Sequence, residues 1–280
     1  ATEAYSDPGD DGGCPYFVPI GNRHLLLHYS HKYGARYALG HYDTSRHIFH
    51  PTSGARINTV SQIGGYCAPA AWRDPQNPQN PLAIYVMHGI RQPAVMSLPH
   101  RLTLPGPCGD ALAACPAASL EKWRRNHRHL TQNIQAGEVV FPEIHGTSLE
   151  MEITIRCNQD CAPELRFFRE EAGKAYTSLR LYPAGGSKTK EKGEWHFSDT
   201  LVLQCDRSNP SMAAPPPEAI ELPYRDGDER KLHIFLDRSV IEVFAQDTLS
   251  LGRRVFPDPS HCGVSALSHF GSFTLTKDAW

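Results

Sequence analysis

Short apolar runs of strand length, bounded by Gly, Pro, Asn and Asp, recur along nearly the whole chain, and helical periodicity is almost absent. This pattern predicts a mostly antiparallel β protein. The runs at 23–30 (RHLLLHYS) and 36–42 (RYALGHY) are separated by a short turn at 32–34 and predict a hairpin. Further strands are expected at 82–87, 98–104, 149–156, 165–169, 178–182, 194–197, 201–205, 231–236, 240–244 and 271–276.

One helix is expected at 117–126 (AASLEKWRRN), which follows a Pro, contains no Gly and carries its basic residues toward its end. It divides the chain into two parts. Residues 1–110 have Pro- and Gly-rich strands with irregular loops, as in the blades of a propeller, and 131–280 have strands suited to a two-sheet sandwich. Residues 111–130 are therefore expected to be a linker that contains the short helix.

Composition excludes several classes of function. With 40% hydrophobic residues among 280, the chain has enough apolar side chains for a full core. Lys plus Arg number 28 and Asp plus Glu number 30, so we expect neither a nucleic acid nor an acidic membrane as a partner. No apolar run approaches the roughly 18 residues of a membrane span, so the chain is expected to be soluble. The opening ATEAYSDPGDDGG has no signal-peptide features and reads like a piece cut from inside a longer protein, and the compartment stays open.

The most informative stretch is FLDRSVIEVFA at 235–245, two alternating runs joined at Asp237, Arg238 and Ser239. Read alone, it predicts a hairpin with a charged turn and with Glu242 pointing away from the core. As a sequence motif, it closely resembles the signature of the C-terminal β-sandwich of glycoside hydrolase family 32, which contains invertases, levanases and inulinases.

Other stretches resemble blocks of the same family in the same order. They are CPYFVPIG at 14–21, APAAWRD at 68–74, SLPHRLTL at 97–104, LQCDRS at 203–208, RRVFP at 253–257 and the final Trp280. The resemblance spans nearly the whole chain. It implies an all-β fold in which the later blades of a five-bladed β-propeller precede a two-sheet β-sandwich. It also implies retaining hydrolysis of a β-fructofuranoside, sucrose or a fructan, without a cofactor.

The catalytic residues of the family cannot be carried over. Retaining hydrolysis needs a nucleophilic carboxylate and a carboxylic acid roughly 5 Å apart. The family's acid precedes the Cys of the Cys-Pro block, where this chain has Gly13, and Asp11 is the nearest substitute. Asp7-Pro8-Gly9 and Arg73-Asp74-Pro75 resemble the other two catalytic motifs but stand in the wrong order, so Asp74 is interpreted first as a turn residue. The catalytic residues are thus unknown.

Tyr66 and Trp72 are the candidate sugar-binding residues, because sugar rings pack on aromatic faces. The alternative is that both rings fill space between blades. Eight cysteines and fifteen histidines raise the hypothesis of a metal site, in which Cys157, Cys161, His127 and His129 supply part of the ligands of a zinc ion. The sequence has no second closely spaced pair of ligands, so no metal is expected. The cysteines are interpreted as isolated thiols in a β core.

Two function classes remain from the sequence. The chain is either the C-terminal part of a fructosidase or a catalytically silent homologue, which includes a carbohydrate-binding or structural β module. Gly13 favours the silent homologue for this chain, whereas the sandwich signatures favour an enzyme as its parent. A metal-dependent protein is a third class, which elemental analysis distinguishes.

Overall fold

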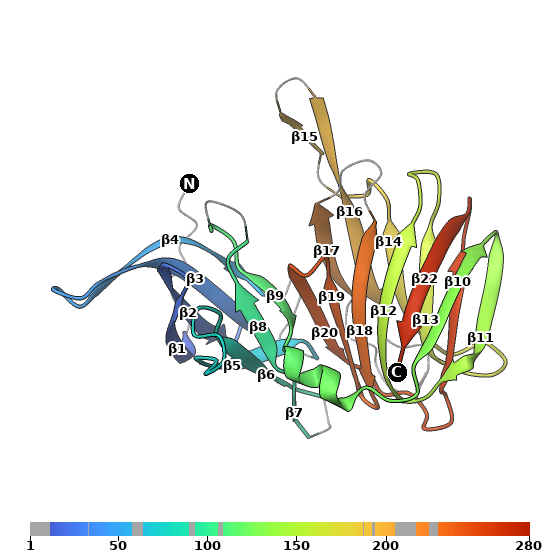
Figure 1. Cartoon of the computed structure of the whole chain (residues 1–280), viewed down its shortest axis with the longest axis horizontal. Coiled ribbons are helices and arrows are strands. Elements are labelled where there is room, and N and C mark those ends of the chain that lie inside the picture. Colours follow the sequence, from blue (N-terminus) through green and yellow to red (C-terminus); the bar gives the residue numbers. More distant parts are fainter. Residues whose placement is uncertain are drawn as a thin grey trace. The chain divides into compact units, whose positions relative to one another are not determined.

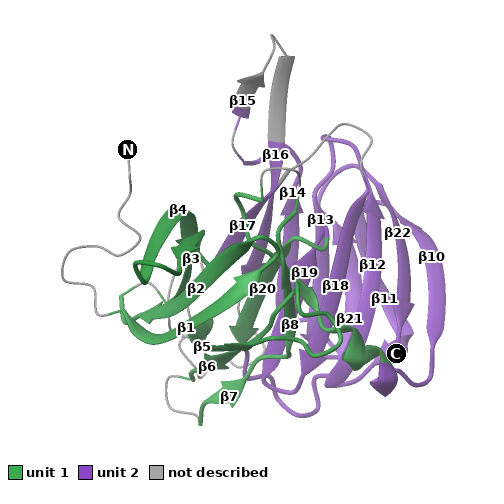
Figure 2. Ribbon diagram, turned by 60° about the vertical axis from the view of Figure 1, so that its left-hand side comes forward, with its two compact units in different colours: residues 1–121, 247–254 green, residues 122–246, 255–280 purple. Residues whose placement is uncertain are grey.

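The computed structural model describes residues 12–32, 34–57, 64–89, 93–105, 109–186, 188–191, 194–204, 217–223 and 229–280. These residues form an all-β fold, as predicted (Figure 1). The chain divides into two compact units, residues 1–121 with 247–254 and residues 122–246 with 255–280 (Figure 2). The first unit thus includes the segment 247–254 from far along the chain.

The first unit begins with a four-stranded antiparallel sheet. Its strands follow one another in the order of the sequence: β1 (Gly13–Ile20), β2 (Arg23–Ser30), β3 (Gly34–Asp43) and β4 (Ile48–Arg56). The predicted hairpin is therefore confirmed as β2 and β3, with Leu26 opposite Ala38. Leu25, Leu27 and Leu39 are fully buried, since alternate residues of a strand point to the same face.

The second sheet of this unit has the strand order β5-β6-β8-β9, with β7 paired to β6. The bounds are β5 (Tyr66–Trp72), β6 (Leu82–Met87), β7 (Val95–Met96), β8 (His100–Thr103) and β9 (Ala113–Pro116). β1, β2 and β3 all contact β5, so the two sheets share one core. The segment with β20 (Leu249–Arg254) joins them from far along the chain, and the amide of Ala114 donates to the carbonyl oxygen of Thr248 at 3.0 Å.

The second unit is built from two further antiparallel sheets. One contains, in order, β10 (Arg128–Ile134), β22 (Phe273–Ala279), β12 (Ser148–Arg156), β18 (Arg230–Asp237) and β19 (Val240–Ala245). The other contains β11 (Gly137–His145), β21 (Gly263–Ser268), β13 (Pro163–Arg169), β14 (Thr177–Tyr182), β16 (Glu194–Gln204) and β15 (Lys188–Glu191), with β17 (Glu218–Pro223) paired to β16.

These two sheets have the character of a sandwich, as expected. Strand β22 alternates strictly, and its buried members include Phe273 and Leu275. Leu165 and Phe167, two residues apart on β13 of the other sheet, are buried as well. One apolar face of each sheet is thus removed from water, the arrangement that stabilises two-layer β folds.

The predicted helix at 117–126 is wrong in type and length. The structure has a six-residue 3₁₀ helix, η1 (Ala118–Trp123), in which no side chain is buried. A segment this short does not offset the cost of helix nucleation by itself, and it presents no apolar stripe to a neighbour. Asn126, with a φ of 57°, lies beyond its end, so the backbone there has left the right-handed helical region.

Lys277 is an unexpected member of the sandwich core. It lies on the buried face of β22, is 1% exposed, and its Nζ stands 2.8 Å from the ring centroid of Phe141 on β11. Among the described residues this nitrogen has no hydrogen-bond partner. Burial lowers the pKa of Lys277 from its ordinary value to about 7, although Glu143 opposes the shift.

We predict that Lys277→Met stabilises the protein at neutral pH by about 2 kcal/mol. The unfolded chain keeps an ordinary lysine pKa and binds more protons than the folded chain between that value and about 7. Wild-type stability should therefore rise with pH across this interval, and the variant should lack this rise. Urea unfolding at neutral and at alkaline pH measures both effects, with Lys231→Met, an exposed lysine, as the control. A wild-type and variant difference that does not change with pH would contradict the prediction.

Candidate functional site

The start of β1 is where the resemblance places the catalytic acid. Gly13 is paired with Tyr29, and the register shifts before Tyr16, so this strand carries an irregularity of the bulge type. Cys14, with a φ of 47°, lies within it and has an exposed thiol. Residue 13 offers no proton donor, and Asp11 lies outside the described residues.

Tyr66 lies in a buried aromatic group at the start of β5. Its ring centroid is 5.0 Å from that of Tyr85 and 5.1 Å from that of His100, which meets it edge-on. Tyr66 is 1% exposed, so neither face of its ring is available to a sugar in this structure. The ring is packed inside the first unit.

The backbone of β20 approaches the same ring. A Cβ atom at Gly252 would stand 2.4 Å from Cζ of Tyr66, closer than any real contact. Only glycine fits here without moving the ring. Arg254, two residues on, donates from Nη1 to the carbonyl oxygen of Pro93 at 2.8 Å, which ties the segment to the loop before β7.

Trp72 differs from Tyr66, since it ends β5 with 40% of its surface exposed. The next residues form the turn before β6. The carboxylate of Asp74 accepts a hydrogen bond from the amide of Gln76 at 2.9 Å, and its carbonyl oxygen accepts one from Asn77. Asp74 thus acts as a turn residue, and Trp72 keeps an open ring surface.

A second exposed aromatic group lies on the sheet of β1 to β4. Phe17 is 42% exposed, stacks on His24 at 5.1 Å, and meets Tyr42 and Phe49 edge-on at 5.3 and 5.1 Å. We call these four residues the aromatic surface cluster. Sequence analysis missed it because its members come from four strands, and only the register, with Tyr42 opposite Phe49, brings them together.

Three described carboxylates of the first unit, those of Asp43, Asp74 and Asp110, have structural partners. Hydrogen bonds from the Ser45 hydroxyl and from the amides of Arg46 and Ser45 lower the pKa of Asp43. Asp110 pairs with Arg23 at 2.9 Å. With Asp74 in its turn, these groups satisfy amides and a guanidinium, and none of the three is arranged as a proton donor.

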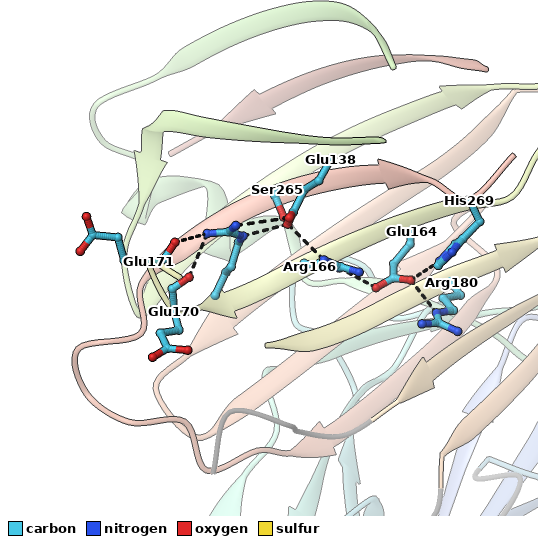
Figure 3. Close-up of polar contacts among 9 residues, drawn as sticks. Glu138, Glu164, Arg166, Glu170, Glu171, Arg180, Ser265 and His269 are labelled. Atoms are coloured by element: carbon cyan, nitrogen blue, oxygen red, sulfur yellow. Dashed lines mark hydrogen bonds and ion pairs between the residues drawn. The ribbon is translucent and has the colours of Figure 1, made fainter. Parts of the chain in front are cut away.

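The second unit contains a buried ionic network on β13 and its neighbours (Figure 3). Glu164 is fully buried and accepts hydrogen bonds from Nε of Arg166 at 2.7 Å, from Nε of Arg180 at 2.6 Å, and from His269. Burial alone would raise the pKa of Glu164, but the hydrogen bonds from Arg166 and His269 hold it below its usual value. This carboxylate stays ionised and saturated by cations.

The network continues to Glu138 on β11 (Figure 3). This carboxylate accepts hydrogen bonds from Nε of Arg169 at 2.8 Å and from the hydroxyl of Ser265 at 2.6 Å, and Arg166 lies 3.3 Å away. Against the effect of burial, these contacts lower the pKa of Glu138 to about 2. Two ionised carboxylates held by several cations form a structural network, because neither can donate a proton near neutral pH.

A further group surrounds the final residue, Trp280. Arg124 lies 4.0 Å above its ring, and His127 stacks on it at 5.1 Å. His127 and His129 both bind the carboxylate of Asp278, at 2.7 and 2.9 Å. His127 and His129, the two histidines considered for a zinc site with Cys157 and Cys161, thus share Asp278 as a partner.

Within the described ranges, three ligand-type side chains come together at metal-binding spacing: Glu150, Glu152 and His233. Arg124 occupies this position, since its Nη2 pairs with Glu150 at 2.7 Å and also with Glu152. A guanidinium between both carboxylates supplies the positive charge that a metal ion would bring. The arrangement is an ion-pair cluster.

The 235–245 segment forms the predicted hairpin of β18 and β19, with Asp237 opposite Val240. Arg238 adopts a φ of 53° in the turn, and its amide donates to the carbonyl oxygen of Thr147 at 2.6 Å. Glu242, expected to point away from the core, is buried. No helix among the described residues is long and apolar enough to cross a membrane.

Comparisons with known proteins agree with this fold. The family model "Glycosyl hydrolases family 32 C terminal" matches residues 118–279. The chain is similar to solved structures of fructan 1-exohydrolase IIa from Cichorium intybus (14% identity, TM-score 0.76, 96% of this chain and 61% of that one). It is also similar to exo-inulinase from Aspergillus awamori (15%, 0.75, 99% and 58%) and to sucrose-6-phosphate hydrolase from Lactobacillus gasseri (19%, 0.73, 98% and 56%). The chain thus spans about three fifths of these proteins. A search of curated protein sequences finds no match.

We predict that Glu164→Gln lowers the free energy of unfolding at neutral pH by about 2 kcal/mol, because Arg166 and Arg180 lose a buried ionised partner. Since the folded-state pKa of Glu164 is depressed, its contribution is present above the ordinary carboxyl pKa and is lost as the pH falls through the lower value. Denaturant unfolding at neutral and acidic pH measures this difference. The exposed Glu171→Gln is the control, and equal loss in both variants would refute the role of Glu164.

Proposed function

Because the chain belongs to glycosyl hydrolases family 32, whose C-terminal model matches more than half of its residues, we propose that it is the C-terminal part of a β-fructofuranoside glycosidase. In this proposal residues 1–110 supply the later blades of a five-bladed β-propeller, 111–130 link the parts, and 131–280 form the C-terminal β-sandwich. The sandwich hairpin at 235–245 and the family match over 118–279 carry the proposal.

The proposed substrate class follows from what the similar structures contain. The fructan 1-exohydrolase was solved in complex with 1-kestose, and a Bombyx mori β-fructofuranosidase was solved with sucrose. A sugar with a fructofuranosyl unit is accordingly our proposed ligand. Retaining hydrolysis proceeds through a carboxylate nucleophile and a carboxylic acid on opposite sides of the glycosidic bond.

This chain supplies binding surfaces for such a sugar but no described catalytic pair. Trp72 and the aromatic surface cluster offer exposed rings, on which the apolar face of a sugar packs. Gly13 replaces the acid, and the described carboxylates of the first unit that were placed above hold turns and Arg23. We infer that turnover requires carboxylates other than these described ones.

A catalytically silent homologue that binds carbohydrate is the second candidate function. The same observation favours it, since Gly13 cannot donate a proton whereas exposed aromatic rings remain. The two candidates differ in the parent gene, because only an enzyme gene encodes a nucleophile block upstream of Ala1. Fructoside binding without turnover by a chain encoded without that block would favour the silent homologue.

We predict that the purified 280-residue chain releases no fructose from sucrose or inulin. Loss of both nucleophile and acid removes several powers of ten in rate. Gly13→Glu alone should not produce turnover, because the attacking carboxylate is still missing. Fructose release measured over hours tests this, with an intact fructosidase as the positive control. Turnover at an enzymatic rate that Asp11→Asn abolishes would show that Asp11 is the acid and would overturn the prediction.

A further inference from the structure

Two cysteines lie close together at one end of the sandwich. Cys157 and Cys161 are in the connection between β12, in one sheet, and β13, in the other. Cys157 is half-buried and Cys161 is fully buried. The thiol of Cys161 donates to the carbonyl oxygen of Asn158 at 3.2 Å, and each of the two cysteines shifts the pKa of the other. The two side chains are therefore neighbours in this short connection.

The loop between them is fixed by its neighbours. The amide of Asp160 donates to the side-chain oxygen of Asn158 at 3.3 Å, which shapes the turn. A Cβ at Gly271 would stand 2.1 Å from the carbonyl oxygen of Asp160 and 3.0 Å from Cβ of Cys161. Since Gly271 also has a φ of 65°, glycine there permits the close approach of this loop to β22. The position of Cys161 is thus fixed by the packing of this loop.

A buried cation lies beside the pair. Arg230 on β18 donates from Nη1 to the carbonyl oxygen of Cys157 at 2.8 Å, while its Nε binds Asp199 at 2.7 Å. The thiol of Cys161 and the charge of Arg230 lower the pKa of Cys157, with burial and Asp199 opposing them. The pKa of Cys161 is raised by the neighbouring Cys157 side chain and by burial. One sulfur is therefore favoured as the thiolate while the other keeps its proton.

We propose that Cys157 and Cys161 are a redox-active pair that a hydroperoxide oxidises to an intramolecular disulfide. The Cys157 thiolate attacks the terminal peroxide oxygen, the O–O bond breaks, and the leaving oxygen takes a proton, which gives a sulfenic acid and water or an alcohol. The Cys161 sulfur then attacks the Cys157 sulfur, the S–O bond breaks, and the hydroxyl leaves as water with the Cys161 proton. The two thiols lose two electrons in total, which reduce the peroxide.

The described surroundings favour this chemistry over metal binding. Neither thiol belongs to a group of three ligand-type side chains at metal-binding spacing within the part of the chain that the structure describes. The half-buried cysteine has the lowered pKa and the fully buried cysteine the raised one, which is the arrangement of an attacking and a resolving cysteine. The disulfide would join two residues of the connection between β12 in one sheet and β13 in the other.

The test uses the full chain, reduced and then exposed to about one equivalent of hydrogen peroxide. Residues 157–166 (CNQDCAPELR) form one tryptic peptide with both cysteines, because Arg156 precedes it and Arg166 ends it. After free thiols are alkylated, we expect this peptide to be unalkylated and lighter than its reduced form by two hydrogens. Dithiothreitol should restore two alkylatable thiols.

Three variants assign the steps. Cys161→Ser should accumulate a sulfenic acid at Cys157 that dimedone traps, and Cys157→Ser should leave Cys161 alkylatable once the peptide is released. Cys262→Ser, which removes a half-buried thiol elsewhere, should leave the disulfide yield unchanged. Cys157 should react at least about tenfold faster than Cys262 in the same sample. Circular dichroism confirms that each variant is folded.

Two results would overturn the proposal. The first is a 157–166 peptide that keeps both thiols under peroxide that already oxidises Cys262. The second is a disulfide that joins Cys157 or Cys161 to any other cysteine of the chain.

Discussion

The contact between the Tyr66 ring and the backbone of Gly252 is the constraint on which the first unit depends. No side chain fits at residue 252, since its Cβ would overlap the ring, and the ring itself is buried against Tyr85 and His100. The segment 247–254 follows most of the sandwich strands in sequence but completes the other unit. The first unit is therefore discontinuous, and its folding requires segments that lie before and after strands β10 to β19 in the sequence.

In the second unit, apolar side chains fill the core and carboxylates are paired with cations outside it. Inward-facing side chains such as Phe167 and Leu275 fill the core, while Glu164 and Glu150 are each held by guanidinium and imidazole groups. Cations saturate these carboxylates, so the most conspicuous acidic groups of the sandwich serve structure. Lys277 is the exception, because it brings an amine into the apolar core beside Phe141.

Sequence periodicity was sufficient for the all-β fold and for the hairpins at 23–43 and 235–245, because alternation and turn residues are local signals. It failed at 117–126, where helix-forming residues have no partner face to bury. Strands such as β4 and β10 are largely polar and exposed, so pairing with neighbours defines them rather than their own pattern. For the candidate sugar-binding residues, the sequence could not show that Tyr66 is buried and Trp72 is exposed. Burial depends on the tertiary contact at Gly252, far along the chain.

The most direct test of this account is amide hydrogen exchange in Gly252→Ala, with Gly12→Ala as the control, since a Cβ at residue 12 meets only ordinary contacts. Forcing a methyl group onto the Tyr66 ring should cost about 1–3 kcal/mol. We predict faster exchange in β5, β6 and β20 of the variant, while strands β12 and β22 of the sandwich keep their protection. Unchanged protection of β5 and β6 in Gly252→Ala would contradict the claim that the 247–254 segment completes the first unit.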